Sequence, residues 1–358
     1  MKYKIKYKMN KIRKRKNEHL DIVLHEDVEP HFSYLSQYFL DYVSMPEIDM
    51  NEIETNFSFF GFPLSFPFYI SSMTGGSQLA KKINTNIAIA CEEEKIGFGL
   101  GSMRIVYEKP ETLSSFDVKK HCPNIPMFTN LGIVQLNYGM KYDDIQNLID
   151  KVSADGIFFH INHLQEAIQP EGNKNYKNLL NKFEKIVTKL EIPVIIKEVG
   201  HGIDYKTAKR LYEIGVKWID VSGTGGTSWA LIEGYRRLKH KEKRTQGNLG
   251  YIFRSQGIPT PEAILDLKKI KGLNIIAGGG VRSGLHIAIS IALGANMATS
   301  ARPFLKAATQ SPEAVMKIIQ GYKDELRTAM FLSGAKNLKQ LSKHKVTKRK
   351  DCFWNFEK

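Results

Sequence analysis

The sequence predicts an α/β protein built as a (β/α)8 barrel, the TIM-barrel fold, with an N-terminal extension. Three observations support this fold class. Eight short apolar runs recur between residues 66 and 302, helix-like stretches lie between them, and each run ends in polar or glycine-rich residues. Strand and helix alternating eight times is typical of a closed parallel barrel. An open, doubly wound sheet is the alternative, and it requires a reversal of strand order that a sequence does not display.

The predicted strands are continuously apolar rather than alternating, as strands covered on both faces of a sheet require. In chain order they are "FPFYISS" (66–72), "KIGFGLG" (95–101), "PMFTNLG" (126–132), "GIFFHIN" (156–162), "PVIIKEV" (193–199), "WIDVSG" (218–223), "LNIIAGG" (273–279) and "NMATSAR" (296–302).

Helices are predicted in the stretches between these runs. The stretch at 204–215 ends on glycine, and the stretch at 260–272 opens on threonine and proline, which are ordinary helix boundaries. The full set is 78–94, 141–153, 176–190, 204–215, 260–272, 284–294 and 311–326.

The composition is that of an ordinary soluble globular protein, with 358 residues, 42% of them hydrophobic, and 28 glycines. Cys91, Cys122 and Cys352 form neither a C-x-x-C pair nor a disulfide framework. We therefore expect free thiols and a cytoplasmic location. No apolar run reaches about 18 residues, and the basic N-terminus lacks the apolar stretch of a secretory signal, so we expect no membrane span.

The net charge of +15 is concentrated at the two ends of the chain. Residues 1–16 hold nine Lys or Arg and no acid, and "KNLKQLSKHKVTKRK" (336–350) is a second basic run. Basic ends leave a nucleic-acid-binding protein open as a competing interpretation. The charge of the two ends is its only support, because no recognised nucleic-acid-binding motif accompanies it.

We expect three parts along the chain: a basic tail over 1–12, a barrel with an N-terminal lid over 13–330, and a basic C-terminal tail over 331–358. In the first part, the lysines from Lys2 to Lys8 alternate with apolar residues. This period of two is typical of an added edge strand, but we favour a solvated chain end, because basic runs are common at chain ends.

Polar side chains and glycines stand where each predicted strand ends. In chain order the ends read "SSMTGGS", "GSMR", "TNLG", "HINHLQE", "KEVG", "VSGTGGTSW", "GGGVRSG" and "SAR". In a (β/α)8 barrel the carboxyl ends of the strands form the active face. We therefore expect these residues in one site, with His160 and Asn162, two residues apart, on the same side of their strand.

Two glycine clusters in this set indicate a bound phosphate. "GTGGTS" (223–228) and "GGGVRSG" (278–284) leave backbone amides bare before predicted helices, and barrels often hold phosphate near the last two strands. Lys197 ends a buried strand, where it needs an anion, an electron-rich ring or an internal ion pair with Glu198. With small residues in "SSMTGGS", against which a flat ring could stack, these features suggest flavin mononucleotide (FMN).

Several segments between about residues 13 and 310 match one known family. They are "RKNEHL" (15–20), "SMTGG", "GSMR", "NLG", "KEVG", "GIPT", "GGGVRSG", "ARPFLKA" and, most specifically, "HINHLQEAIQPEG" and "DVSGTGGTSW". Through them the sequence resembles the flavin-dependent, type 2 isopentenyl-diphosphate isomerases. The resemblance implies an FMN-carrying barrel that interconverts isopentenyl and dimethylallyl diphosphate in isoprenoid biosynthesis, and we expect a homo-oligomer, a tetramer or an octamer. Arg302 departs from the family pattern, in which leucine is common at this position.

The resemblance also implies roles for individual residues. Contacts with FMN are implied for Ser72, Met73, Thr74, Ser102, Asn130, Lys197, Ser222, Thr227, Gly280, Val281, Arg282, Ala301 and Arg302. Contacts with the substrate diphosphate are implied for Arg15, Lys16, His19, Ser102 and Arg104. Gln165 would lie at the allylic carbons, which makes Gln165, His160 and Asn162 the candidate catalytic residues. Glu166 would bind Mg²⁺ together with the diphosphate.

The reaction adds a proton at one end of a double bond and removes a proton at the other. The candidate side chains are poor proton donors, because Gln165 is an amide and Glu166 is expected to hold metal. We therefore expect reduced FMN to act as acid and base without net redox, with NADPH keeping it reduced. An FMN-dependent 2-hydroxy-acid oxidoreductase of the same barrel type is the alternative, but it needs a histidine near strand six, where "SGTGGTSW" has none.

Overall fold

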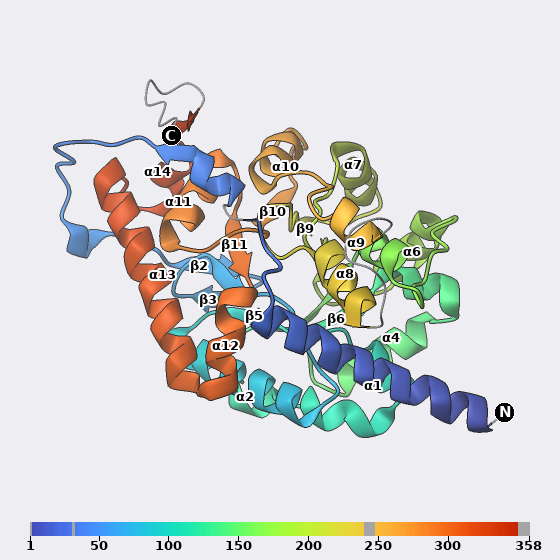
Figure 1. Ribbon diagram of the computed structural model, residues 1–358. Helices are drawn as coiled ribbons and strands as arrows, with labels where there is room; N and C mark the ends of the chain where they lie inside the picture. Colours follow the sequence, from blue (N-terminus) through green and yellow to red (C-terminus); the bar gives the residue numbers. More distant parts are fainter. Residues whose placement is uncertain (1, 31–32, 240–247, 350–358) are drawn as a thin grey trace.

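The computed structural model describes residues 2–30, 33–239 and 248–349, with the backbone alone described at 2–13 and 239. Eight parallel strands close into a barrel in the order β10-β11-β4-β5-β6-β7-β8-β9 (Figure 1). They are β4 (Phe68–Ile70), β5 (Gly97–Gly99), β6 (Met127–Gly132), β7 (Gly156–His160), β8 (Val194–Lys197), β9 (Trp218–Asp220), β10 (Asn274–Ala277) and β11 (Met297–Ser300). Each strand lies inside the run predicted for it, and the (β/α)8 barrel is confirmed.

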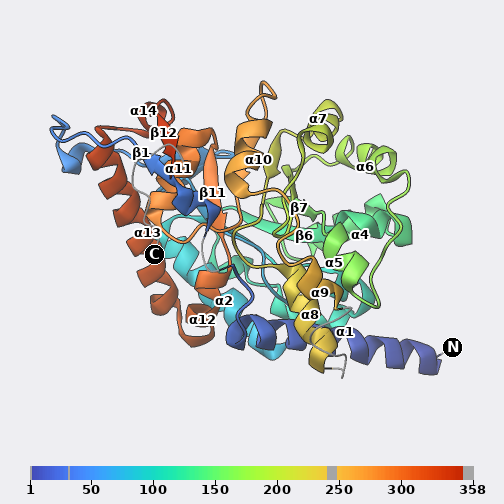
Figure 2. The same ribbon diagram turned by 45° about the horizontal axis from the view of Figure 1, so that its top comes forward.

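Helices follow the strands and surround the barrel (Figures 1 and 2). Those that the sequence predicts are α2 (Gln78–Glu94), α4 (Tyr142–Asp150), α6 (Leu179–Val187), α7 (Tyr205–Glu213), α10 (Thr260–Leu267), α11 (Gly284–Leu293) and α13 (Pro312–Ser333). Further helices lie in the segments after strands β5, β7, β9 and β11 and in the C-terminal segment: α3 (Arg104–Glu108), α5 (His163–Ile168), α8 (Trp229–Lys239), α9 (Leu249–Ile252), α12 (Arg302–Gln310) and α14 (Leu338–Leu341). The 3₁₀ turns are η1 (Tyr34–Gln37), η2 (Met50–Glu52), η3 (Pro110–Ser115), η4 (Lys119–His121) and η5 (Ile133–Tyr138).

The N-terminal segment is a helix, α1 (Lys2–His25), and the edge strand indicated by the alternating lysines is wrong. Lysine is a good helix former, so an alternation of lysine with other residues does not exclude a helix. The C-terminal part of α1 is held by packing, since Ile22 is fully buried in a cluster with Ile232 and Trp229 of α8. The N-terminal half of α1 extends past the edge of the barrel in both views (Figures 1 and 2).

The C-terminal segment packs onto the barrel domain as far as it is described. The boundary expected at residue 330 falls inside α13, and Leu341 beyond it is fully buried. Strand β12 (Val346–Lys348) pairs antiparallel with β1 (Tyr38–Leu40). Apolar side chains such as Leu341 therefore hold residues 331–349 against the domain, and the remainder of the expected tail lies outside the described residues.

A β-hairpin covers the amino-terminal end of the barrel. Strands β2 (Phe57–Phe59) and β3 (Phe62–Leu64) pair around a turn at Phe60 and Gly61, both with positive φ. The ring of Phe59 lies 5.0 Å from that of Trp218 and 5.5 Å from that of Phe128, near the starts of β9 and β6. The hairpin therefore closes the amino-terminal end of the barrel, and the carboxyl end is the open one.

None of the helices in the described ranges has the length and apolar character needed to cross a membrane. Cys91 and Cys122 are buried free thiols, as predicted, and Cys352 lies outside the described residues.

Candidate functional site

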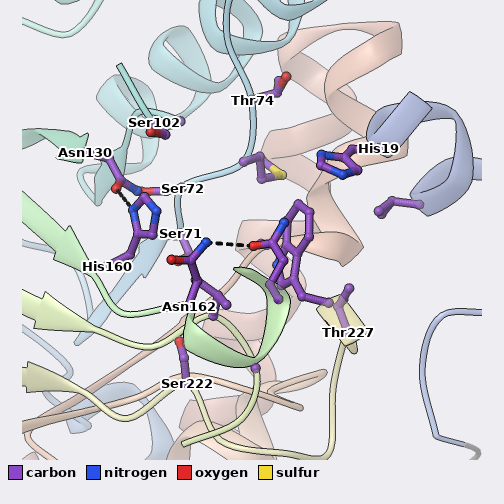
Figure 3. A pocket seen from close by; sticks show the side chains of 18 of the residues that line it. His19, Ser71, Ser72, Thr74, Ser102, Asn130, His160, Asn162, Ser222 and Thr227 are labelled. Carbon is purple, nitrogen blue, oxygen red and sulfur yellow. Dashed lines mark hydrogen bonds between the residues drawn. The ribbon is translucent and has the colours of Figure 1, made fainter. Parts of the chain in front are cut away.

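A pocket of about 250 Å³ lies at the carboxyl ends of the barrel strands. Each strand contributes at least one residue that lies within three residues of its carboxyl end. In chain order these are Ser72, Ser102, Asn130, His160, Lys197, Ser222, Gly280 and Ser300. Figure 3 labels five of them: Ser72, Ser102, Asn130, His160 and Ser222. Helix α1 adds His19 to the pocket wall, and helix α8 adds Trp229. The two rings contact edge to face, with 5.1 Å between their centres.

The pocket gathers the residues that the sequence pointed to, with one exception. Those lining it are Arg15, Lys16, His19, Ser72, Met73, Thr74, Ser102, Arg104, Asn130, His160, Asn162, Gln165, Glu166, Lys197, Ser222, Thr227, Gly280, Arg282, Ala301 and Arg302. The exception is Val281, whose side chain is fully buried and whose carbonyl oxygen accepts bonds from Arg282 (2.7 Å) and Ser300 (2.8 Å). The structure brings these residues together, and their individual roles stay predictions.

Lys197 is buried at the end of β8, and a hydrogen bond to a backbone carbonyl fixes the position of its ammonium group. Its Nζ donates to the carbonyl oxygen of Glu198 (2.7 Å). The Glu198 carboxylate instead accepts from the backbone amides of the next three residues. The structure therefore does not contain the internal ion pair with the Glu198 carboxylate. Burial lowers the pKa of Lys197, against the attraction of the nearby Asp220.

Asp220 organises the strand end next to Lys197. It is fully buried on β9 opposite Lys197, and it accepts hydrogen bonds from Tyr69 Oη (2.9 Å) and from Ser222 Oγ (2.8 Å). Ser222 has φ 32°, in the left-handed region that a residue with a Cβ rarely adopts. Strain of this kind gathers where the backbone must present a group to a ligand. Its place in the pocket wall is consistent with the predicted flavin contact.

The two glycine clusters pack against each other, which is a second reason for glycine there. A Cβ on Gly226 would lie 2.5 Å from the backbone nitrogen of Gly280. A Cβ on Gly280, where φ is +80°, would lie 2.6 Å from the carbonyl oxygen of Gly225. The loops after β9 and β10 therefore touch backbone to backbone. Within the described part of the chain the backbone amide of Gly280 donates to no protein acceptor, so it is available to an anion.

Three of the residues for which a contact with FMN is implied converge on a carboxylate that the sequence did not single out. Arg282 binds Glu29 with Nη2 at 2.5 Å from Oε1 and Nε at 3.2 Å from Oε2. Arg302 Nη1 lies 3.2 Å from Oε2, and Thr227 donates to Oε1 (2.9 Å). Burial would raise the pKa of Glu29, but Arg282 and then Arg302 lower it below its usual value. These contacts define an anion site, which we call the Glu29 site.

A second group of cations lies where α1 meets α3. Lys16 Nζ donates to the carbonyl oxygen of Ser102 (3.0 Å) and lies 5.4 Å from the centre of the Phe116 ring. Burial, with Arg15 and Arg104 nearby, lowers the pKa of Lys16 to about 7. Burial and Arg104 also lower the pKa of Arg15. Neighbouring cations repel one another, which lowers their pKa values. An anion bound between them removes this repulsion, so the group forms an anion-binding site.

His160 is held as a neutral ring beside this second group. Its Nδ1 lies 2.6 Å from Oδ1 of Asn130 (Figure 3). Because an amide oxygen only accepts, Nδ1 carries the proton and Nε2 is left as an acceptor. Burial, with Lys197 and Lys16, lowers the pKa of His160 to about 3.

The residues after His160 form a chain of amides. Asn162 donates to Oε1 of Gln165 (3.0 Å), and Gln165 donates to Glu233 (3.1 Å). Glu166 accepts from the backbone amide of Asn173 and, at 3.3 Å, from Asn162. Two buried oxygens in the pocket wall, Ser72 Oγ and Asn162 Oδ1, have no partner within the described part of the chain.

Glu233 is the main site residue that the sequence did not reveal. It is fully buried on α8 and accepts from His19 Nε2 (2.9 Å), Gln165 and Arg236 Nη1 (2.5 Å). Burial would raise its pKa, but these partners lower it to about 2. Its carboxylate therefore ties α1 to the chain after β7. A charge inside the apolar segment "SWALIEGY" was the available indication.

The chain is similar to known proteins over most of its length. Residues 160–348, more than half of the chain, match the model of the FMN-dependent dehydrogenase family. The isopentenyl-diphosphate delta-isomerase of Nostoc sp. is 42% identical over 330 residues, which cover 91% of this chain and 93% of that protein. The protein of the same name from Rickettsia bellii is 41% identical, over 92% of this chain and 96% of that protein.

Solved structures of lower sequence identity share the fold. Mandelate oxidase with benzaldehyde superposes with a TM-score of 0.62 at 15% identity, covering 95% of this chain and 98% of that one. Flavocytochrome b2 with benzoylformate gives a TM-score of 0.63 at 18% identity, covering 88% of this chain and 76% of that one. At such identities the likeness concerns the barrel alone.

Proposed function

The chain belongs to the isopentenyl-diphosphate delta-isomerase family, and we propose that it interconverts isopentenyl and dimethylallyl diphosphate with FMN as cofactor. One observation carries the proposal: a single pocket holds two separate groups of cations. Arg282 and Arg302 with Thr227 suit the single phosphate of a flavin nucleotide, and Arg15, Lys16 and Arg104 suit a diphosphate.

The pocket wall fits a flavin on grounds independent of the relatives. Ser72 Oγ and Asn162 Oδ1 are buried polar atoms without partners, and a ligand with donors and acceptors would satisfy them. Lys197, with its ammonium group in the wall, suits a ring that carries negative charge. When bound and reduced, by NADPH in our proposal, FMN supplies the acid and base and a negative charge beside the developing cation.

The remaining steps fall to side chains of this chain. The diphosphate is bound by Arg15, Lys16 and Arg104. His19 of α1 and Trp229 of α8 exclude water from the reacting carbons. The Gln165 amide is held at both ends, by Asn162 and by Glu233, so it is a fixed dipole, and in our proposal it faces the allylic carbons of the substrate. His160 is neutral and orients Asn130 and, through Nε2, an O–H or N–H of the ligand.

Glu166 is our candidate for Mg²⁺ binding. Within the described residues there is no group of three or more acidic, histidine or cysteine side chains that could hold a metal. A site there needs oxygens from the diphosphate and water, which is how Mg²⁺ is commonly held. Glu166 Oε1, whose contact with Asn162 is long at 3.3 Å, is the oxygen that can serve it. The homo-oligomer and the cytoplasmic location also stay predictions.

Besides the fold, the oxidoreductase alternative has only the match of residues 160–348 to the FMN-dependent dehydrogenase model, which indicates the FMN-binding barrel rather than the reaction. The solved structures of mandelate oxidase and flavocytochrome b2 are 14 to 18% identical to this chain, against about 40% for the isomerases. The segment after β9, which would need a histidine, supplies Ser222 and Thr227 to the pocket.

The test is a pair of measurements on purified full-length protein. The absorption spectrum, recorded with and without added FMN, should show a bound flavin. With NADPH and Mg²⁺ under anaerobic conditions, isopentenyl diphosphate should then be converted to the dimethylallyl isomer. Conversion that is independent of flavin, or oxidation of mandelate or another 2-hydroxy acid in its place, would overturn the proposal.

A further inference from the structure

The Glu29 site holds an internal carboxylate in the manner of a bound phosphate. Arg282 contacts both carboxylate oxygens, as arginine does with phosphate, and Arg302 and the Thr227 hydroxyl complete the shell. Thr227 and Arg282 come from the loops after β9 and β10, and Arg302 is the first residue of α12 after β11, while Glu29 comes from the segment after α1. The pairing joins residues 253 positions apart, so it is a product of the fold rather than of local sequence.

The surroundings show that this carboxylate is placed rather than left in solvent. The Glu29 side chain is only 15% exposed. Its segment is anchored on both sides, because Ser228 donates its amide to Val28 (2.8 Å) and Ser33 lies against Gly280. Arg302 also points to the end of α1, where Nη2 lies 3.3 Å from the carbonyl oxygen of Glu26.

We propose that Glu29 is an intramolecular ligand of the phosphate subsite, which the cofactor phosphate must displace, so that Glu29 helps to set the affinity and selectivity for FMN. This inference rests on the proposed function, because it takes the Glu29 site as the place of the flavin phosphate.

Charge and tethering explain how the exchange would be balanced. A phosphate monoester carries a charge of about −1.5 to −2 and three acceptor oxygens. It therefore binds two arginines more tightly than one carboxylate does. Glu29 is tethered to the same chain, which gives it a high effective concentration at the site. When a site is open in only a fraction of molecules, the apparent affinity of its ligand falls by that fraction. Occupancy by Glu29 in nine of ten molecules would weaken FMN binding about tenfold.

The test compares Glu29→Gln with wild type and with Glu26→Gln, in full-length protein freed of flavin by dialysis. Glu26→Gln removes the same charge three residues away, and the contact of Glu26 with Arg302 is through its backbone carbonyl. Fluorescence titration with FMN and with riboflavin, which lacks the phosphate, gives the two affinities. We expect Glu29→Gln to bind FMN about tenfold more tightly and riboflavin unchanged, with Glu26→Gln like wild type for both.

Three outcomes would overturn the inference: equal FMN affinity in wild type and Glu29→Gln, weaker FMN binding in the variant, or a gain for riboflavin as large as that for FMN. If neither protein binds FMN, the proposed function fails. Inorganic phosphate then tests the inference alone, because it should raise the melting temperature of Glu29→Gln more than that of wild type, and equal shifts would refute it. Should Glu29→Gln not fold, Glu29→Asp, which keeps the charge but shortens the reach, should show a smaller gain in FMN affinity, and no gain would refute the inference.

Discussion

Replacing Glu233 by glutamine tests whether one buried carboxylate holds the N-terminal helix over the pocket. The substitution keeps the shape of the side chain, and its amide oxygen can still accept from His19 and Gln165. Its amide nitrogen, however, would face Nη1 of Arg236, which now donates to Glu233 at 2.5 Å. The variant therefore places a donor against a donor in a site without water access.

The structure sets the size of the expected effect. The fall of the Glu233 pKa from 4.5 to about 2 corresponds to about 3 kcal/mol in favour of the folded state. Part of that figure requires His19 to be protonated, and burial lowers the pKa of His19, so the ring is neutral at pH 7. We therefore expect Glu233→Gln to lose about 2 kcal/mol of unfolding free energy at pH 7, the range of a hydrogen bond to a buried charge.

Urea unfolding of wild type, Glu233→Gln and Glu171→Gln measures this loss. Glu171 also binds Arg236 (2.9 Å), but its side chain is 42% exposed, so its loss should cost less than about 1 kcal/mol. Because the Glu233 pKa is lowered in the folded state, its contribution is complete above pH 4.5 and is lost as the pH falls toward 2. The difference between wild type and Glu233→Gln should thus be equal at pH 8 and 7, where the His19 ring is neutral. A difference no larger than that of Glu171→Gln, or one that changes between pH 8 and 7, would refute the reasoning.

Other predictions concern the pocket wall. Since burial lowers the pKa of Lys16 to about 7, the KM for the diphosphate should rise about tenfold per pH unit above 7. Lys16→Arg should remove this dependence, and a flat wild-type profile of KM from pH 7 to 9 would contradict the prediction. Glu166→Gln should need more Mg²⁺ and be partly rescued by excess metal, whereas Gln165→Ala should lose turnover without rescue, and turnover against Mg²⁺ concentration with reduced flavin would expose the opposite pattern. Ser222→Gly should exceed Ser222→Ala in unfolding free energy by about 1 kcal/mol, because only alanine keeps a Cβ at φ 32°, and equal values would mean that the backbone is unstrained.

The barrel strands were predictable because their information is local. Each strand is a short apolar run, and a strand buried on both faces must be one. Once the barrel class is inferred, the position of the site follows, since parallel strands present their carboxyl ends to the same side. For this reason the sequence alone predicts that Ser72, Asn130, Lys197 and Ser222, which are far apart in the chain, lie in one site.

The N-terminal segment shows where local patterns were insufficient. The alternation of lysines from Lys2 to Lys8 has the period of a strand, but lysine itself favours a helix, so the period and the propensity conflict. What decides between them is the next part of the helix, where Ile22 packs against Ile232 of α8. That contact spans most of the chain, and no window of sequence contains both partners.

The sequence by itself determined the barrel, the strand ends that line the pocket and the family. The tertiary structure alone decided which charges face one another. Glu29 meets Arg282 253 positions away, and Glu233 meets His19 214 positions away. A carboxylate in a loop or on a helix carries no local mark of its partner, because the free energy of a buried charge depends on the groups that surround it after folding.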